Sequence, residues 1–110
     1  MAKHFTDSDF ATNVEQFKGV AIVDFWASWC GPCLMVAPVI EELSEEYSDD
    51  SSVTIGKVNV DECKETAGKY GIMSIPTVVI FKDGNVVETI IGARGKSDYK
   101  DLIEKHENCL

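Results

Sequence analysis

The hydrophobic positions along the chain change period several times, which divides it into short elements. A nearly continuous apolar run at 19–27, GVAIVDFWA, is typical of a strand buried on both faces. Apolar residues at helical spacing precede it at 8–17 and follow it at 33–47, where Pro38 predicts a kink. Further along, the pattern predicts strands at 53–60, 77–82 and 86–91, and helices at 61–70 and behind Ser97. This order of elements predicts a mixed sheet sandwiched between helices, an α/β fold.

Turn and cap residues mark the ends of these elements. Asp83-Gly84-Asn85 stands between two strand patterns and predicts a hairpin, and therefore an antiparallel pair. Thr6 or Asp7 can cap the helix predicted at 8–17, and Asp61 can cap the helix predicted at 61–70. Their side-chain oxygens can accept hydrogen bonds from free helix amides. The sequence contains no repeat or linker, and its length is that of one domain, so we expect residues 1–110 to form a single domain.

Charge and the first residues limit the classes of partner. The chain has 10 basic and 19 acidic side chains, a net charge of −9, which repels phosphate backbones and argues against nucleic acid as a partner. Residues 1–20 mix charged and apolar positions without a secretory pattern, and no apolar run approaches membrane-spanning length. We therefore expect a soluble cytoplasmic protein that does not bind membranes.

Two cysteines three positions apart, in the segment WCGPC, carry the most specific chemistry. Gly31-Pro32 sits where a helix would begin, since proline in the first helical turn loses no needed hydrogen bond. Cys30 then precedes the helix and Cys33 lies in its first turn, within disulfide range. The free amides and the dipole of the helix start favour a thiolate at Cys30. We expect Cys30 to be the exposed nucleophile and Cys33 the resolving thiol that faces the core.

A zinc site is the main alternative for a lone CxxC pair. A closed structural zinc site needs four ligands, and the sequence has neither a second CxxC nor a pair of histidines. The other candidate ligands are His4, Cys63, His106 and Cys109. Because they are scattered, we favour redox chemistry and expect no metal.

The chain resembles the thioredoxin family over nearly its whole length. Besides WCGPC, the matching segments are KVNVDE at 57–62, YGIMSIPTVVIFKDG at 70–84 and IGA at 91–93. The resemblance implies a thioredoxin fold, with a central mixed five-stranded sheet flanked by four helices. It also implies a monomeric general protein-disulfide reductase, active in electron transport and cell redox homeostasis. Its redox group would be the Cys30–Cys33 disulfide, with no other cofactor.

The electron donor must be a separate protein, because the sequence lacks a glycine-rich dinucleotide fingerprint. The resemblance implies that this donor is a thioredoxin reductase and that the other partners are disulfide-containing substrate proteins. Two further functions stay open at this point: a disulfide oxidase or isomerase on the same fold, and a non-catalytic subunit of a larger complex. The Gly-Pro dipeptide between the cysteines and the absence of a signal peptide favour the reductase.

Asp24 is an acid inside an apolar strand, where a buried carboxylate is costly unless it is paired or protonated. An edge bulge that points Asp24 to water is one explanation. The resemblance implies another, a buried general base with a raised pKa that helps to deprotonate Cys33 through water. It also implies that Lys57, on the neighbouring strand, is the charge partner of Asp24.

The resemblance further implies a substrate-binding surface around the thiols. Ile75-Pro76 would form a loop with a cis-proline, whose backbone pairs with an extended substrate segment. Ordinary loop packing explains Ile72 and Met73 as well as substrate contact does. The expected substrate contacts are Trp29, Gly31, Pro32, Ile72, Met73, Ile75, Pro76, Gly92 and Ala93.

Two cysteines, Cys63 and Cys109, are not among the residues that the family requires. We expect Cys63 to lie accessibly in the first turn of the third helix, where Lys64 would lower its pKa and neighbouring acids would raise it again. We interpret it as an incidental or regulatory thiol. We expect Cys109 on a frayed C-terminus.

Overall fold

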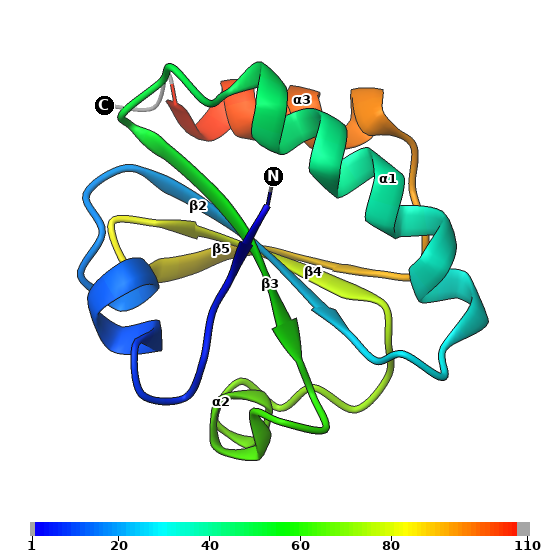
Figure 1. The fold of residues 1–110 in the computed structure, drawn as a ribbon. Helices are drawn as coiled ribbons and strands as arrows, with labels where there is room; N and C mark the ends of the chain where they lie inside the picture. Colours follow the sequence, from blue (N-terminus) through cyan, green and yellow to red (C-terminus); the bar gives the residue numbers. More distant parts are fainter. Residues whose placement is uncertain (1, 108–110) are drawn as a thin grey trace.

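A computed structural model describes residues 2–107 and shows a five-stranded sheet with the strand order β1-β3-β2-β4-β5 (Figure 1). Its strands are β1 (Lys3–His4), β2 (Val20–Trp26), β3 (Val53–Asn59), β4 (Thr77–Lys82) and β5 (Asn85–Ile91). Its helices are η1 (Ala11–Glu15), α1 (Gly31–Glu46), α2 (Lys64–Lys69) and α3 (Lys96–Glu107). The expected sheet of five strands with four helices is confirmed for this part of the chain.

The sheet is mixed, as expected. β1, β3 and β2 run parallel, whereas β4 is antiparallel to β2 and β5 is antiparallel to β4. Figure 1 shows α1 and α3 on one face of the sheet and η1 and α2 on the other. Because β2 pairs on both edges and is covered on both faces, nearly all of its side chains are buried. This position explains the continuous apolar run at 19–27.

Alternate residues of β2 enter two separate cores. Val20 and Ile22 pack with α1 and α3, whereas Val23 and Phe25 pack with the aromatic cluster on the face of η1 and α2. Since side chains of a strand alternate between the faces, Asp24 points to the α1 and α3 face. The fold therefore directs this acid toward the helix that begins at the cysteine pair.

Two features of the N-terminal region differ from the expectation. The pattern of hydrophobic positions did not place β1, because a strand of two exposed residues has no hydrophobic period to detect. The first helix is a short π-helix, and neither Thr6 nor Asp7 caps it. Instead, the Asp7 carboxylate accepts hydrogen bonds from the backbone amide (2.9 Å) and the hydroxyl of Thr66, at the start of α2.

The hairpin between β4 and β5 is confirmed. Asp83 and Gly84 both have positive φ angles, of 51° and 86°, and Lys82 pairs with Asn85 across the turn. A side chain at Gly84 would overlap the carbonyl oxygen of Glu15. The turn thus needs glycine both for its backbone angle and for the close approach of η1.

Replacing Gly84 by alanine is expected to lower the free energy of unfolding by about 2 kcal/mol or more, because of the positive φ and the overlap with Glu15. Urea unfolding of both proteins measures the change. Gly68→Ala is the matched control: Gly68 lies within α2 and has open space around it, so alanine there should be neutral or stabilising. Equal effects at the two positions would contradict this account of the turn.

Candidate active site

Cys30 and Cys33 form a disulfide at the start of α1, with their Cα atoms 5.3 Å apart. Cys30 is the N-cap residue, and its sulfur accepts a hydrogen bond from the Cys33 amide at 3.2 Å. Gly31 begins the helix and Pro32 follows in the first turn, where it costs no helical hydrogen bond. The expected placement of the pair at a helix start is confirmed.

Both cysteines are buried in this disulfide state, Cys30 with 4% and Cys33 with 1% of its surface exposed. They pack with Ala27 against neighbours that include Trp26 and Ile75. The expectation that Cys30 would be exposed is therefore wrong for the oxidised form. Part of the reason is tertiary: Val60 and Ile75, which are distant along the chain, pack against the pair, and the local sequence does not encode these contacts.

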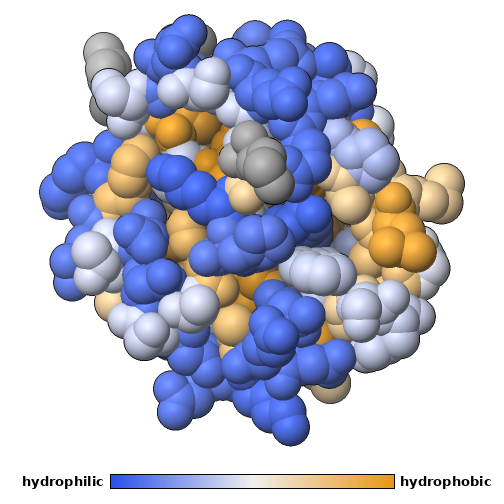
Figure 2. Space-filling view, viewed as in Figure 1, coloured by the Kyte–Doolittle hydropathy of each residue, from blue (hydrophilic) through white to orange (hydrophobic). Residues whose placement is uncertain are grey.

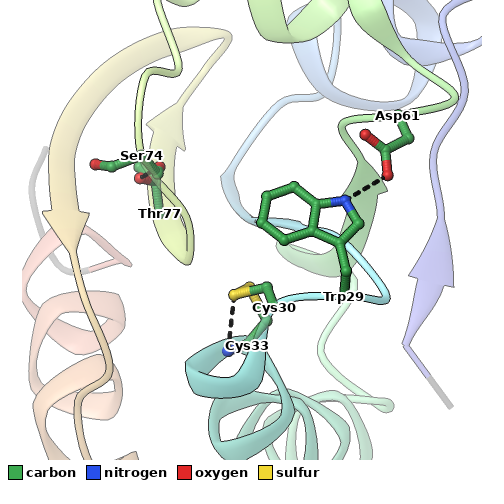
Figure 3. The surroundings of a disulfide bond; sticks show 6 residues. All are labelled: Trp29, Cys30, Cys33, Asp61, Ser74 and Thr77. Carbon is green, nitrogen blue, oxygen red and sulfur yellow. Dashed lines mark hydrogen bonds between the residues drawn. A yellow bond between two sulfur atoms is a disulfide. The ribbon is translucent and has the colours of Figure 1, made fainter.

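Trp29 stands beside the disulfide and is 70% exposed. Its indole N–H donates a hydrogen bond of 2.8 Å to Asp61, whose own backbone amide is held by the Asn59 side chain. Figure 3 shows this ring on one side of Cys30 and the segment with Ser74 and Thr77 on the other. Asp61, expected as a helix cap, instead fixes the orientation of Trp29. No local pattern predicts a contact between residues so far apart in the sequence.

The loop opposite the thiols is held by hydrogen bonds at its two ends. The Ile75–Pro76 peptide bond is cis, as the resemblance implied. The Thr77 hydroxyl donates to the Ser74 carbonyl at 2.6 Å, and the Gly92 amide donates to the Pro76 carbonyl at 2.9 Å. The second bond brings the segment of Gly92 and Ala93 next to this loop.

The residues expected to contact substrate differ in exposure. Met73 is 96% exposed, so packing does not explain its apolar side chain, whereas Ile72 packs against the core. Gly31, Pro32 and Ala93 are exposed. Figure 2 shows a mainly hydrophilic face with hydrophobic surface in several places, one of them at its right side, over the first turns of α1. Leu34 and Met35 of those turns, which we did not expect to be functional, are also exposed.

Asp24 lies on β2 in the middle of the sheet, paired in register with Lys57 on one side and Val78 on the other. It is only 1% exposed, so the edge-bulge explanation is wrong. Neither carboxylate oxygen has a hydrogen-bond partner among the described residues. Burial raises the pKa of Asp24 to about 7, and the positive charge of Lys57 opposes this rise. Asp24 can therefore gain or lose a proton near neutral pH.

Lys57 acts on Asp24 through its charge and not through a hydrogen bond. Its ammonium lies 3.4 Å from a carboxylate oxygen of Glu41 and 5.4 Å from the centre of the Trp26 ring. The contact with the ring is a cation–π interaction. Sequence reasoning missed Glu41, because an acid on a helix surface carries no sign of a partner on a strand.

The comparison with known families agrees with this geometry: the family model named Thioredoxin matches residues 1–105. The chain belongs to the thioredoxin family. It is 52% identical to the thioredoxin of Bacillus subtilis over 101 residues, which cover 92% of this chain and 93% of the relative. It is 51% identical to the thioredoxin of Listeria monocytogenes over 106 residues, or 96% and 99% of the two chains. Together with the disulfide, family membership makes the chain a thiol-disulfide oxidoreductase that reduces protein disulfides.

Cys63 is not the accessible thiol that the sequence led us to expect in this thioredoxin-family chain. It is 4% exposed, and its thiol donates to the Phe5 carbonyl at 3.6 Å. Burial, and next the negative charge of Asp7, raise the pKa of Cys63 above its ordinary value. The predicted influence of Lys64 is thus outweighed, because the N-terminal segment covers the thiol. Cys109 lies outside the described residues.

A Cys63→Ser variant is expected to reduce insulin at a rate within a factor of about two of the wild type, because a buried, protonated thiol is a poor nucleophile. In the native protein, iodoacetamide should label Cys63 far more slowly than a free thiol in solution, which peptide mapping can measure. Rapid native labelling of Cys63, or a large loss of activity in the variant, would show that this thiol belongs to the catalytic relay.

The two described histidines have structural surroundings. His4 lies on the edge strand β1, and the His106 ring lies 2.8 Å from a Glu88 carboxylate oxygen. Within residues 2–107, no group of three or more His, Cys, Asp and Glu side chains could hold a metal ion.

Proposed function

We propose that the chain is a general reductant of protein disulfides, with Cys30 as the nucleophile and Cys33 as the resolving thiol. The observation that carries this assignment is the position of Cys30 at the N-cap of a sixteen-residue helix, where its sulfur accepts a hydrogen bond from the Cys33 amide. The helix dipole and this hydrogen bond both stabilise a thiolate on Cys30.

The reaction transfers two electrons in two exchange steps. The Cys30 thiolate attacks one sulfur of the substrate disulfide, which forms a mixed disulfide and releases one substrate thiolate that takes up a proton. Cys33, once deprotonated, attacks the sulfur of Cys30. The second substrate thiolate leaves, and the Cys30–Cys33 disulfide forms. The substrate is reduced by two electrons and the cysteine pair is oxidised by two.

Asp24 is the proposed proton acceptor for Cys33, with Lys57 as the nearby charge that modulates it. Support comes from the burial of Asp24 on the sheet face covered by α1 and from its pKa of about 7, which allows proton uptake at neutral pH. A carboxyl group with an ordinary pKa would be a weaker base there.

Substrate is proposed to bind across Trp29, Met73 and the loop of Ile75 and Pro76. The side chains of Trp29 and Met73 are large, apolar and exposed, and such a surface favours contact with other proteins. An extended substrate segment would pair with the backbone at Ile75, which gives affinity with little demand on substrate side chains. Gly31, Pro32, Ile72, Gly92 and Ala93 complete the proposed contact surface.

We further propose that the chain works as a cytoplasmic monomer of one domain, with the redox disulfide as its only redox group and a thioredoxin reductase as its electron donor. The described residues include no helix long and apolar enough to cross a membrane. The acidic net charge of −9 disfavours nucleic acid as a partner.

The test is insulin reduction by the purified chain, followed by turbidity, with electrons supplied by dithiothreitol or by purified reductases with their reduced nicotinamide cofactor. We expect catalytic turnover with dithiothreitol and with at least one reductase. Turnover with neither donor would reject the proposed function. A redox potential near that of a strong oxidant would instead assign the chain to disulfide formation.

A further inference from the structure

The position of the Lys57 ammonium is unexpected for a residue paired with Asp24. The two residues lie opposite each other on adjacent parallel strands, and the side chains of such a pair leave the same face of the sheet. Yet the Asp24 oxygens have no hydrogen-bond partner among residues 2–107, whereas the Lys57 ammonium lies 3.4 Å from Glu41 on α1. The ammonium is thus directed to the helix and to the Trp26 ring, and not to the buried acid.

Glu41 is also held in place by the N-terminal segment, at a residue that directly precedes β1. Its other carboxylate oxygen accepts a hydrogen bond of 2.8 Å from the backbone amide of Ala2, which is 4% exposed and packs in the core. The Ala2 amide and, to a smaller extent, the Lys57 ammonium hold the pKa of Glu41 below its ordinary value of 4.5. Glu41 therefore carries its negative charge throughout the neutral pH range, in a fixed position.

We propose that Glu41 is a positioning residue whose carboxylate holds the Lys57 ammonium away from Asp24 and so sets how readily Asp24 gains and loses its proton. The inference rests on the proposed function, in which Asp24 accepts the proton of Cys33. Its physical basis is competition between two carboxylates for one ammonium: the anchored, partly exposed Glu41 contacts it, and the buried Asp24 has no hydrogen bond to it.

The other groups that face Asp24 do not replace Lys57. Val78 on β4 is apolar, and Tyr99 on α3 stays neutral, because burial raises its pKa above the ordinary value of 10. Cys30 and Cys33, at the start of α1, do not titrate while they form a disulfide. Among residues 2–107 of the oxidised protein, Lys57 is the charged group that acts on Asp24, and Glu41 is the acid that binds Lys57.

Replacing Glu41 by glutamine removes the charge but keeps an oxygen that can accept the Ala2 hydrogen bond. The Lys57 ammonium is then free to approach Asp24, and a closer positive charge favours the ionised form of Asp24. We expect its titration midpoint in the oxidised protein to fall by roughly half to one pH unit, the size of a charge effect over several ångströms of protein.

The experiment follows the Asp24 carboxyl carbon by ¹³C NMR as a function of pH in the oxidised full chain. Glu42→Gln is the matched control, because Glu42 is the next residue on α1 but is 60% exposed and pairs with Lys96 at 3.5 Å. It should move the midpoint far less than Glu41→Gln. A purely structural role of Glu41 would leave the midpoint unchanged in the glutamine variant.

A double-mutant cycle then tests whether the effect passes through Lys57. In a Lys57→Met background, Glu41→Gln should shift the Asp24 midpoint much less than in the wild type. An unchanged midpoint in Glu41→Gln, an equal shift in Glu42→Gln, or a full shift without Lys57 would each overturn the inference. The proposed function is tested separately, by the rate at which Asp24→Asn releases a mixed disulfide, so the two can fail independently.

Discussion

A Cys30→Ser variant is expected to retain less than about 1% of the wild-type rate of insulin reduction, because serine cannot attack a disulfide under these conditions. A Cys33→Ser variant should still attack substrate but should then accumulate the mixed disulfide, since no second thiol expels the bound partner. Non-reducing electrophoresis and mass spectrometry of each variant with a disulfide substrate separate the two outcomes.

The assignment of roles can also be checked without mutation. In the reduced wild type at neutral pH, iodoacetamide should label Cys30 before Cys33, because the helix N-terminus stabilises the thiolate of Cys30. Cys63→Ser is the matched control for loss of a thiol outside the pair and should trap no mixed disulfide. Faster labelling of Cys33, or trapping by Cys30→Ser, would reverse the proposed roles.

The elements with strong local signals were predicted from the sequence. A continuous apolar run predicts β2, and Asp83-Gly84-Asn85 predicts the β4–β5 hairpin. The helical period together with Gly31-Pro32 predicts α1, which begins at Gly31 as expected. These signals depend on neighbours within a few positions. β1 has no such signal: its two residues form a strand because β3 offers an open edge beside them.

The site shows the same limit. The cysteine pair and the buried acid could be recognised from residue type and spacing, since both are unusual in their local setting. Three contacts at the site join residues that are far apart in the sequence. They are the Trp29–Asp61 hydrogen bond, the contact of the Cys63 thiol with the Phe5 carbonyl, and the Lys57–Glu41 ion pair. Their partners are fixed only when the sheet and helices have packed, so sequence reasoning assigned Asp61 and Cys63 wrongly and missed Glu41.

An Asp24→Asn variant is expected to be more stable than the wild type above neutral pH but not at pH 4. The native state raises the pKa of Asp24 from its ordinary value of 3.8 to about 7, so it keeps a proton that the unfolded chain has lost between these values. The wild type therefore loses stability as pH rises from 4 to 7, while asparagine, which has no charge to bury, does not. Over this pH interval, the free energy of unfolding of the wild type is expected to fall by roughly 4 kcal/mol relative to that of the asparagine variant.

Urea unfolding of the oxidised proteins at pH 4, 6 and 8 measures this difference, and Asp101→Asn is the matched control, because Asp101 is exposed on α3. The gain in free energy of unfolding from Asp24→Asn should grow with pH, while the change caused by Asp101→Asn stays near zero. The same variant should release a mixed disulfide about tenfold more slowly or worse, since Cys33 has lost its proton acceptor. A variant that gains stability but releases substrate at the normal rate would show that Asp24 destabilises the fold without accepting a proton. Cys33 would then give its proton directly to solvent.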